Sequence, residues 1–254
     1  MEKRDKGKKK AGRSIWSQVL LVICLAVMAV SGYMLYAQLA EYHAGRVSYD
    51  KLAQEINPEK AKTEWPDVDF DSLKAINPDI AGWLICEDTS INYPVVQGRD
   101  NSYYLNHLFD GTVNKAGCLF IDYQNTPGFA DQNTIIHGHN MKNKTMFSAL
   151  TKYKDQEFYE KHRRMKLLTE ERNYFIELFA GYVTDQQDNA WQIGFADEDG
   201  FKAWIKQAVA RSTFRSDVAV GAEDRVVTLS TCSYEFDDAR YVLFGKLVPV
   251  DAAS

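Results

Sequence analysis

The segment "VVTLSTCSYEFDDARYVLFGKL", residues 226–247, places a cysteine at the end of one predicted β-strand and an arginine at the start of the next. The β-branched and apolar run up to Thr231 is typical of a strand, and so is the run that begins at Tyr241. The residues between these runs are mostly polar or acidic, as in a loop. Two neighbouring strands joined by this loop would bring Cys232 and Arg240 close together.

A cysteine in this position has two interpretations. A neighbouring positive charge favours the thiolate over the thiol, and the thiolate is the nucleophilic form. The alternative is a buried cysteine that packs as a small hydrophobic side chain, which is the common role of an isolated cysteine. A nucleophilic cysteine needs a partner that transfers protons, so the histidines of the chain bear on the choice.

The chain from Phe70 onward consists mostly of short apolar segments separated by turn residues. Seven or eight such segments within about 180 residues predict a mainly β fold, a closed barrel or a sandwich. Two segments have helical patterns instead, "TMFSALTKY" (145–153) and "DEDGFKAWIKQAVARS" (197–212). The predicted strands lie in "AGWLIC", "INYPVVQG", "GCLFIDY", "NTIIHGH", "MKLLTE", "NYFIELFAGYVT", "RVVTLSTC" and "RYVLFGKLVPV".

The N-terminal residues differ in composition from the rest of the chain. Residues 1–13 hold seven Lys or Arg against two acidic residues, so they carry +5 of a total formal charge of -5 and the remainder carries -10. With 45% hydrophobic and 26% charged residues among 254, the composition fits one folded domain with a sizeable core. We expect no nucleic-acid partner for the acidic remainder.

Residues 15–39, "IWSQVLLVICLAVMAVSGYMLYAQL", predict a transmembrane helix, because they contain no charged side chain and about 20 apolar residues cross the bilayer core. Trp16 near one end and Tyr33 and Tyr36 near the other fit interfacial aromatic belts. The preceding lysines favour a cytoplasmic N-terminus, which places the acidic remainder outside the cell. The alternative is a signal peptide cleaved within residues 37–40.

The four cysteines, at positions 24, 86, 118 and 232, form no CxxC pair, so we expect neither a zinc site nor a dense disulfide framework. Cys86 and Cys118 either form a disulfide in an oxidising compartment or are two buried thiols. We expect no metal and no other cofactor.

Five histidines occur, and three of them are poor catalytic candidates: His43 beside the membrane segment, His107 in a predicted turn and His162 in a charged, solvated stretch. The other two, His137 and His139, lie in "NTIIHGHNMKNKTMF", where an apolar strand ends in a polar loop. A histidine at the end of one strand can reach the end of another. Since residues two apart in a strand point to the same face, the spacing leaves both histidines open.

These residues resemble the sortases, and class B in particular, over about Asp71 to Val250. The central motif TLxTC is present as "TLSTC", residues 228–232, and the family's arginine corresponds to Arg240. The segments "INYPVVQGRDNSYYLNHLF" and "GHNMKNKTMFSAL" and the long helical insertion before the cysteine also look like class B. Five common residues alone would be a weak motif, whereas these segments in this order are specific.

The resemblance implies a nucleophile at Cys232, an acid–base histidine at His139 and an arginine at Arg240 that orients the substrate or binds the oxyanion. The family places its histidine directly after a glycine, which only His139 satisfies. Class B members often have an aromatic residue at the position of His137.

The substrate groove is carried over from the same resemblance. It assigns substrate-binding roles to Asn101, Leu105, Ser230 and Thr231, with turn formation and core packing as the alternative for such residues. Trp191 lies in a segment where the alignment is loose, and it receives no assignment.

The function that the resemblance implies is that of a cysteine transpeptidase without a cofactor. Such an enzyme cleaves a C-terminal sorting signal of a secreted protein after threonine, through a thioester, and transfers the protein to an amine of a cell-wall peptide or to a pilin lysine. The implied location is the membrane of a Gram-positive cell, with the catalytic domain outside.

Two other classes remain as alternatives. L,D-transpeptidases and papain-like wall hydrolases also combine Cys and His, but the chain has no Ser-x-Gly-Cys segment, and its His139 precedes Cys232 by 93 residues. A membrane-tethered binding module with a structural cysteine is the other alternative.

The sequence thus predicts four regions. These are a cytoplasmic basic tail (1–14), a transmembrane helix (15–39), a stalk with an N-terminal helix (40–69) and a catalytic domain (70–254).

Overall fold

The computed structural model describes residues 15–56 and 65–250. Its contacts divide the chain into two units, Met1–His43 and Ala44–Ser254. The predicted basic tail, residues 1–14, lies outside the described residues, and so does part of the predicted stalk, residues 57–64.

Helix α1 (Ile15–Ile56) contains the apolar N-terminal segment. Within Ile15–Gln54 an 18-residue window reaches a mean hydropathy of 2.4, and the helix is long and apolar enough for a single membrane span. The helix also includes residues 41–56, since no proline interrupts the helical sequence there.

The C-terminal part of α1 packs on the domain that follows. The hydroxyl of Tyr49 donates to the carbonyl of Gly117 at 2.7 Å, and its ring meets Tyr93 edge-on at 5.2 Å. Tyr49 is buried, so this part of the helix belongs to the core of the second unit.

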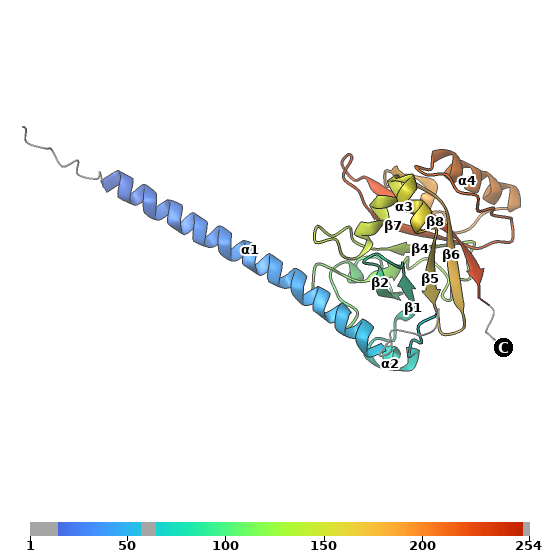
Figure 1. The fold of residues 1–254 in the computed structure, drawn as a ribbon, viewed down its shortest axis with the longest axis horizontal. Helices are drawn as coiled ribbons and strands as arrows, with labels where there is room; N and C mark the ends of the chain where they lie inside the picture. The colour runs from blue at the N-terminus through green and yellow to red at the C-terminus, as the bar shows by residue number, and fades with distance from the viewer. Residues whose placement is uncertain (1–14, 57–64, 251–254) are drawn as a thin grey trace, which may run out of the picture. The chain divides into compact units, whose positions relative to one another are not determined.

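Eight strands form a closed barrel in the order β1-β2-β3-β4-β7-β8-β6-β5 (Figure 1), which confirms the predicted mainly β fold. Closure leaves no strand edge unpaired. The pairs β2–β3 and β4–β7 are parallel and the other pairs are antiparallel. The strands are β1 (Ile80–Ile85), β2 (Asn92–Val96), β3 (Leu119–Ile121), β4 (Asn133–His137), β5 (Arg164–Leu168), β6 (Asn173–Thr184), β7 (Val226–Cys232) and β8 (Arg240–Pro249).

Short helices fill the connections between the strands. Both predicted helical segments are helical, the first as the 3-10 helix η2 and the second as α4, which begins at the cap of Asp197. Phe201 and Trp204 of α4 pack with Phe179 of β6 and Phe244 of β8 in one buried cluster. The helices are α2 (Phe70–Ile76), η1 (Tyr103–Leu105), η2 (Phe147–Lys154), α3 (Gln156–Lys161), η3 (Asn189–Trp191) and α4 (Glu198–Arg211).

The topology determines where the polar residues of the central motif meet. Because β4 and β7 are parallel neighbours, their C-terminal ends lie at the same end of the barrel. Strand β8 runs antiparallel to β7, so its first residue lies at that same end. Three chain segments that are far apart in sequence are therefore brought to one place.

Candidate active site

Cys232 and Arg240 are directly opposite each other in the β7–β8 pair, as the sequence predicts. Residues opposite each other in an antiparallel pair present their side chains on the same face of the sheet. The Nη1 of Arg240 donates to the carbonyls of Asp238, at 3.2 Å, and Ala239, at 3.1 Å. Among the described residues no carboxylate pairs with Arg240, so its charge is available to a ligand at Cys232.

The segment after β4 is fastened to the end of β7 by three hydrogen bonds. The amide of Gly138 donates to the carbonyl of Ser230 at 3.1 Å. The hydroxyl of Thr231 donates to the carbonyl of Gly138 at 2.7 Å. The Nδ2 of Asn140 donates to the carbonyl of Cys232 at 2.9 Å. His139, which lies within this segment, is thereby held beside Cys232.

The glycine before His139 is required by close packing. A Cβ atom on Gly138 would lie 2.5 Å from Cδ2 of Leu119 and 2.6 Å from Cδ2 of Phe147. Real Cβ atoms essentially never approach a neighbour so closely. The Gly-His pair therefore has a structural reason in this fold.

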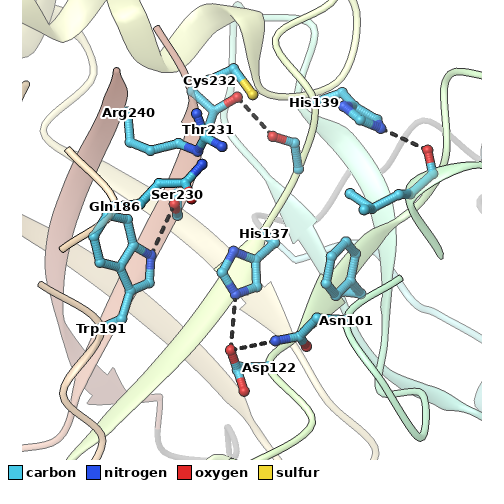
Figure 2. Close-up of a pocket in the computed structure, with 13 residues that line it drawn as sticks. Asn101, Asp122, His137, His139, Gln186, Trp191, Ser230, Thr231, Cys232 and Arg240 are labelled. Carbon is cyan, nitrogen blue, oxygen red and sulfur yellow. Dashed lines mark hydrogen bonds and ion pairs between the residues drawn. The ribbon is translucent and has the colours of Figure 1, made fainter. Parts of the chain in front are cut away.

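The imidazole of His139 is oriented by the main chain of η1. Its Nε2–H donates to the carbonyl of Leu105 at 2.7 Å. Among the described residues its Nδ1 has no hydrogen-bond partner, so this nitrogen is available for proton transfer. In Figure 2 the sulfur of Cys232 points to the side of the pocket on which His139 lies.

A pocket of about 440 Å³ contains these three side chains (Figure 2). All seven residues assigned from the sequence line it, together with six that received no assignment there. The assigned residues are Asn101, Leu105, His139, Ser230, Thr231, Cys232 and Arg240, and the additional ones are Phe120, Asp122, His137, Gly138, Gln186 and Trp191.

The four residues assigned to substrate binding differ in what their side chains contact. Leu105 is 43% exposed and can meet a ligand with its side chain. Ser230 is buried, and its hydroxyl accepts from Nε1 of Trp191 at 3.1 Å. Thr231 is buried and its hydroxyl proton is used within the protein. Asn101 donates to Asp122 at 2.8 Å.

The other barrel cysteines are free, buried thiols, which decides between the two alternatives for Cys86 and Cys118. Burial raises the pKa of the Cys86 thiol and raises that of Cys118 to about 12. Cys232 is the one cysteine of the described barrel that is partly exposed. Of the thiols of the described barrel, Cys232 is therefore the one that a substrate can reach.

Two further histidines, His107 and His162, stack on aromatic rings. His107 stacks on Tyr103 with ring centroids 3.9 Å apart. His162, expected as solvated surface, is partly buried and stacks on Phe158 at 4.2 Å. The reason is that it is the C-cap residue of α3 and its Nδ1–H donates to the carbonyl of Phe158 at 2.9 Å. In the part of the chain that the structure describes, no group of three or more His, Cys, Asp or Glu side chains could hold a metal ion.

Comparison with known proteins agrees with this geometry. A family model of the sortase domain matches residues 84–248. The chain is also 34% identical to sortase B of Listeria monocytogenes over 241 residues, and this alignment covers 93% of this chain and 98% of that protein. The chain belongs to the sortase family, class B. It is an enzyme of the cysteine transpeptidase type, and the resemblance seen in the sequence is confirmed.

This sortase is similar to further class B members. Sortase B of Staphylococcus aureus is 34% identical over 236 residues, 92% of this chain and 96% of that protein. The solved structure of a Staphylococcus aureus sortase B–substrate complex superposes with a TM-score of 0.75 at 32% identity, covering 84% of this chain and all of that one. The family match, residues 84–248, contains most of the barrel and every residue that lines the pocket.

Proposed function

We propose that this sortase cleaves a C-terminal sorting signal after threonine, holds the cleaved protein as a thioester on Cys232 and transfers it to an amine. The observation that carries the proposal is the meeting of Cys232, Arg240 and His139 at one end of the barrel, in a pocket of about 440 Å³. The similar Staphylococcus aureus sortase B has been solved as a substrate complex, which supports a sorting-signal peptide as the occupant of this pocket.

In the first step, Sγ of Cys232 attacks the carbonyl carbon of the threonine. The thiol proton passes to Nδ1 of His139, the S–C bond forms, the C–N bond to the next residue breaks, and the leaving amine takes this proton from His139. Because Nε2 of His139 is bound to the carbonyl of Leu105 at 2.7 Å, we assign this proton transfer to Nδ1.

In the second step, an amine attacks the thioester. The new C–N bond forms, the S–C bond breaks, and His139 takes the proton that the amine loses. The acceptor we propose is an amine of a peptidoglycan cross-bridge or stem peptide, or a pilin lysine. All of these are primary amines, and the chemistry at Cys232 is the same for each.

Arg240 cannot act as a base, since a guanidinium keeps its proton in proteins and has no acceptor atom. Its planar set of donors suits a carbonyl oxygen that becomes negative in the transition state. Two backbone carbonyls hold one nitrogen of its guanidinium, so the group is already oriented before a substrate binds. We propose that Arg240 binds the oxyanion.

The groove for the sorting signal is formed, in this proposal, by Asn101, Leu105, Ser230 and Thr231. For the two buried hydroxyl residues the contribution is the shape of the pocket wall and the backbone of β7. Trp191 joins them, because its indole is bound to the hydroxyl of Ser230.

The location we propose is the cell membrane, with a single span in residues 15–39, the basic tail of residues 1–14 in the cytoplasm and the catalytic domain of residues 70–254 outside. Residues 40–69 connect the two. The lysine-rich N-terminus supports this orientation, and a sortase acting on secreted proteins needs its pocket outside.

The test is to trap the acyl-enzyme. The full chain in detergent micelles is incubated with a set of peptides that carry threonine near the C-terminus, followed by different residues, and intact mass is measured. We expect an adduct equal to the peptide up to threonine, and hydroxylamine should release it as a hydroxamate. Cys232→Ala should form no adduct while it unfolds at an unchanged temperature. Turnover in Cys232→Ala close to that of the unaltered chain would disprove the mechanism.

A further inference from the structure

The carbonyl of Leu105, which accepts from Nε2 of His139 at 2.7 Å, is packed against the backbone of Gly117. The amide of Cys118 donates to the carbonyl of Tyr104, the residue before Leu105, at 2.9 Å. Gly117 has a φ of +60°, and a Cβ atom on it would lie 2.4 Å from the carbonyl oxygen of Tyr104 and 2.9 Å from that of Leu105. The position of this short segment therefore fixes the carbonyl that orients His139.

Tyr49, in the C-terminal part of α1, binds the same segment. Its side chain is buried, and its hydroxyl donates to the carbonyl of Gly117 at 2.7 Å. The helix backbone also approaches closely here. A Cβ atom on Gly45, about one helical turn before Tyr49, would lie 3.0 Å from Oδ1 of Asn114 and 3.3 Å from Cβ of Ala116. This part of α1 therefore lies directly against the segment that contains Gly117.

A second route leads from Tyr49 to the loop that follows His139. The ring of Tyr49 meets that of Tyr93 edge-on at 5.2 Å, and the hydroxyl of Tyr93 accepts from the amide of Met146 at 3.2 Å. The next residue, Phe147, donates its amide hydrogen to the carbonyl of His139 itself at 2.9 Å. One aromatic side chain of α1 thus supports His139 from two directions along the chain.

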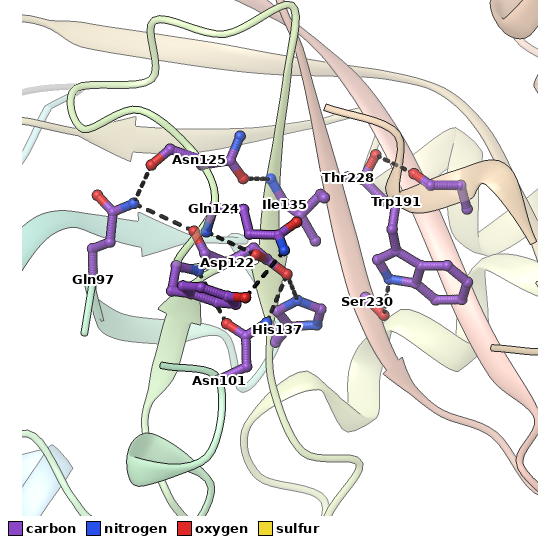
Figure 3. Close-up of polar contacts among 12 residues, drawn as sticks. Gln97, Asn101, Asp122, Gln124, Asn125, Ile135, His137, Trp191, Thr228 and Ser230 are labelled. Atoms are coloured by element: carbon purple, nitrogen blue, oxygen red, sulfur yellow. Dashed lines mark hydrogen bonds and ion pairs between the residues drawn. The ribbon is translucent and has the colours of Figure 1, made fainter. Parts of the chain in front are cut away.

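His137, the other histidine of the pocket, is held by different residues (Figure 3). Its Nε2–H donates to Oδ2 of Asp122 at 3.2 Å, and the same oxygen accepts from Nδ2 of Asn101 at 2.8 Å. Oδ1 of Asp122 accepts from the amide of Gln124 at 3.0 Å. Among the described residues, none of the hydrogen bonds of the Asp122 carboxylate involves α1. The two histidines therefore differ in whether α1 supports them.

We propose that Tyr49 is a positioning residue of this sortase, which orients the imidazole of His139 by the two routes described and so affects both proton transfers. This inference rests on the proposed function, in which Nδ1 of His139 takes up and delivers the proton. A neutral imidazole that donates through one nitrogen accepts through the other. If the carbonyl of Leu105 shifts, the ring can turn or change tautomer, and fewer molecules present an acceptor Nδ1 at Cys232.

The test removes a single oxygen atom from α1. Tyr49→Phe keeps the ring against Tyr93 and loses the hydrogen bond to the carbonyl of Gly117. In the full chain in detergent micelles, we expect kcat on a threonine-containing sorting peptide to fall by about tenfold or more. KM should change by less than about twofold, because Tyr49 does not line the pocket.

Tyr159→Phe is the matched control. Tyr159 is also buried, and its hydroxyl donates to Oγ of Ser216 at 2.7 Å. It belongs to α3 and does not line the pocket that contains His139. Both variants lose one buried hydrogen bond, so both should lower Tm. We expect kcat to stay within about twofold of the unaltered chain in Tyr159→Phe alone.

A double-mutant cycle gives a readout that a purely structural role of Tyr49 would not move. In His139→Ala no imidazole remains to be oriented, so adding Tyr49→Phe should change the slow rate of adduct formation by less than about twofold. In His137→Ala the effect of Tyr49→Phe should persist in full, because His137 is held by Asp122. If Tyr49→Phe fails to fold, as judged by thermal unfolding, the same cycle with Tyr93→Phe decides the question.

The outcomes distinguish this inference from the proposed function. A kcat in Tyr49→Phe within about twofold of the unaltered chain, an equal loss in Tyr159→Phe, or an equal loss with and without His139 overturns the role of Tyr49 and leaves the transpeptidase mechanism standing. A chain that forms no adduct with any of the peptides overturns the mechanism and this inference with it.

Discussion

Replacing Arg240 by lysine separates two roles that a cation beside Cys232 can have. Lysine keeps the positive charge but replaces a planar group of five N–H donors with a flexible ammonium of three. In the structure Nη1 of Arg240 is bound to the carbonyls of Asp238 and Ala239 at 3.2 and 3.1 Å. These two hydrogen bonds orient the guanidinium group of Arg240 so that its remaining N–H groups can donate to an oxyanion on the substrate.

The expected loss of kcat follows from the number of hydrogen bonds to the oxyanion that the substitution removes. A lysine ammonium has all its donors on one nitrogen, so it cannot bind the two backbone carbonyls and present a second, coplanar nitrogen to the oxyanion as the guanidinium does. Loss of one oxyanion donor costs about 2.7–4 kcal/mol, a factor of about 10²–10³ in kcat. We therefore expect Arg240→Lys to lower kcat by at least about 100-fold, with a much smaller change in KM.

The assay measures kcat and KM on a fluorogenic peptide that contains the threonine, and in parallel the rate at which iodoacetamide alkylates Cys232 between pH 5 and 9. If Arg240 acted only by promoting ionisation of Cys232, lysine would preserve most of the turnover. A kcat in Arg240→Lys within about threefold of the unaltered chain would refute the oxyanion role.

Four further predictions follow from other contacts. His139→Ala should lose several orders of magnitude in single-turnover rate and His137→Ala far less; the reverse ranking would reassign the acid. Gly138→Ala should lower stability by about 1–3 kcal/mol, read as a lower Tm, because its Cβ would meet two side chains at 2.5 and 2.6 Å; an unchanged Tm would contradict the packing. At pH 8 iodoacetamide should modify Cys232 and spare the two buried barrel thiols, since burial raises the pKa of both; peptide mapping that finds equal labelling would show that the barrel opens readily. Protease added to intact cells should digest the chain from about residue 41 onward, and protection of that part would reverse the proposed orientation.

The local part of the site could be predicted from the sequence. Cys232 and Arg240 are separated by one short loop, and a hairpin of two strands necessarily places them near each other. The apolar part of helix α1 could be predicted equally well, because a long stretch of apolar, uncharged residues is typical of a membrane-spanning helix. In both cases the information lies within about 40 neighbouring residues.

The other wall of the pocket could not be predicted in this way. Asp122 and Phe120 reach the site because β3 pairs with β4 and β4 with β7, and those pairings depend on closure of the whole barrel. Gln186 and Trp191 come from the connection between β6 and α4, which has no periodic pattern. Sequence spacing also left His137 and His139 equivalent, whereas the contact of His137 with Asp122 distinguishes them.

The position of β8 has a consequence for how activity appears during folding. Among the described residues it is the last strand, and it pairs with β7 on one side and β6 on the other. Until residues 240–249 have been synthesised and have docked, both of those strands keep an open edge, and Arg240 is missing from the pocket. Such late pairing between distant segments is slow compared with helix formation. An incompletely synthesised chain therefore holds Cys232 without Arg240 opposite it, and the pocket is completed in the same event that closes the barrel.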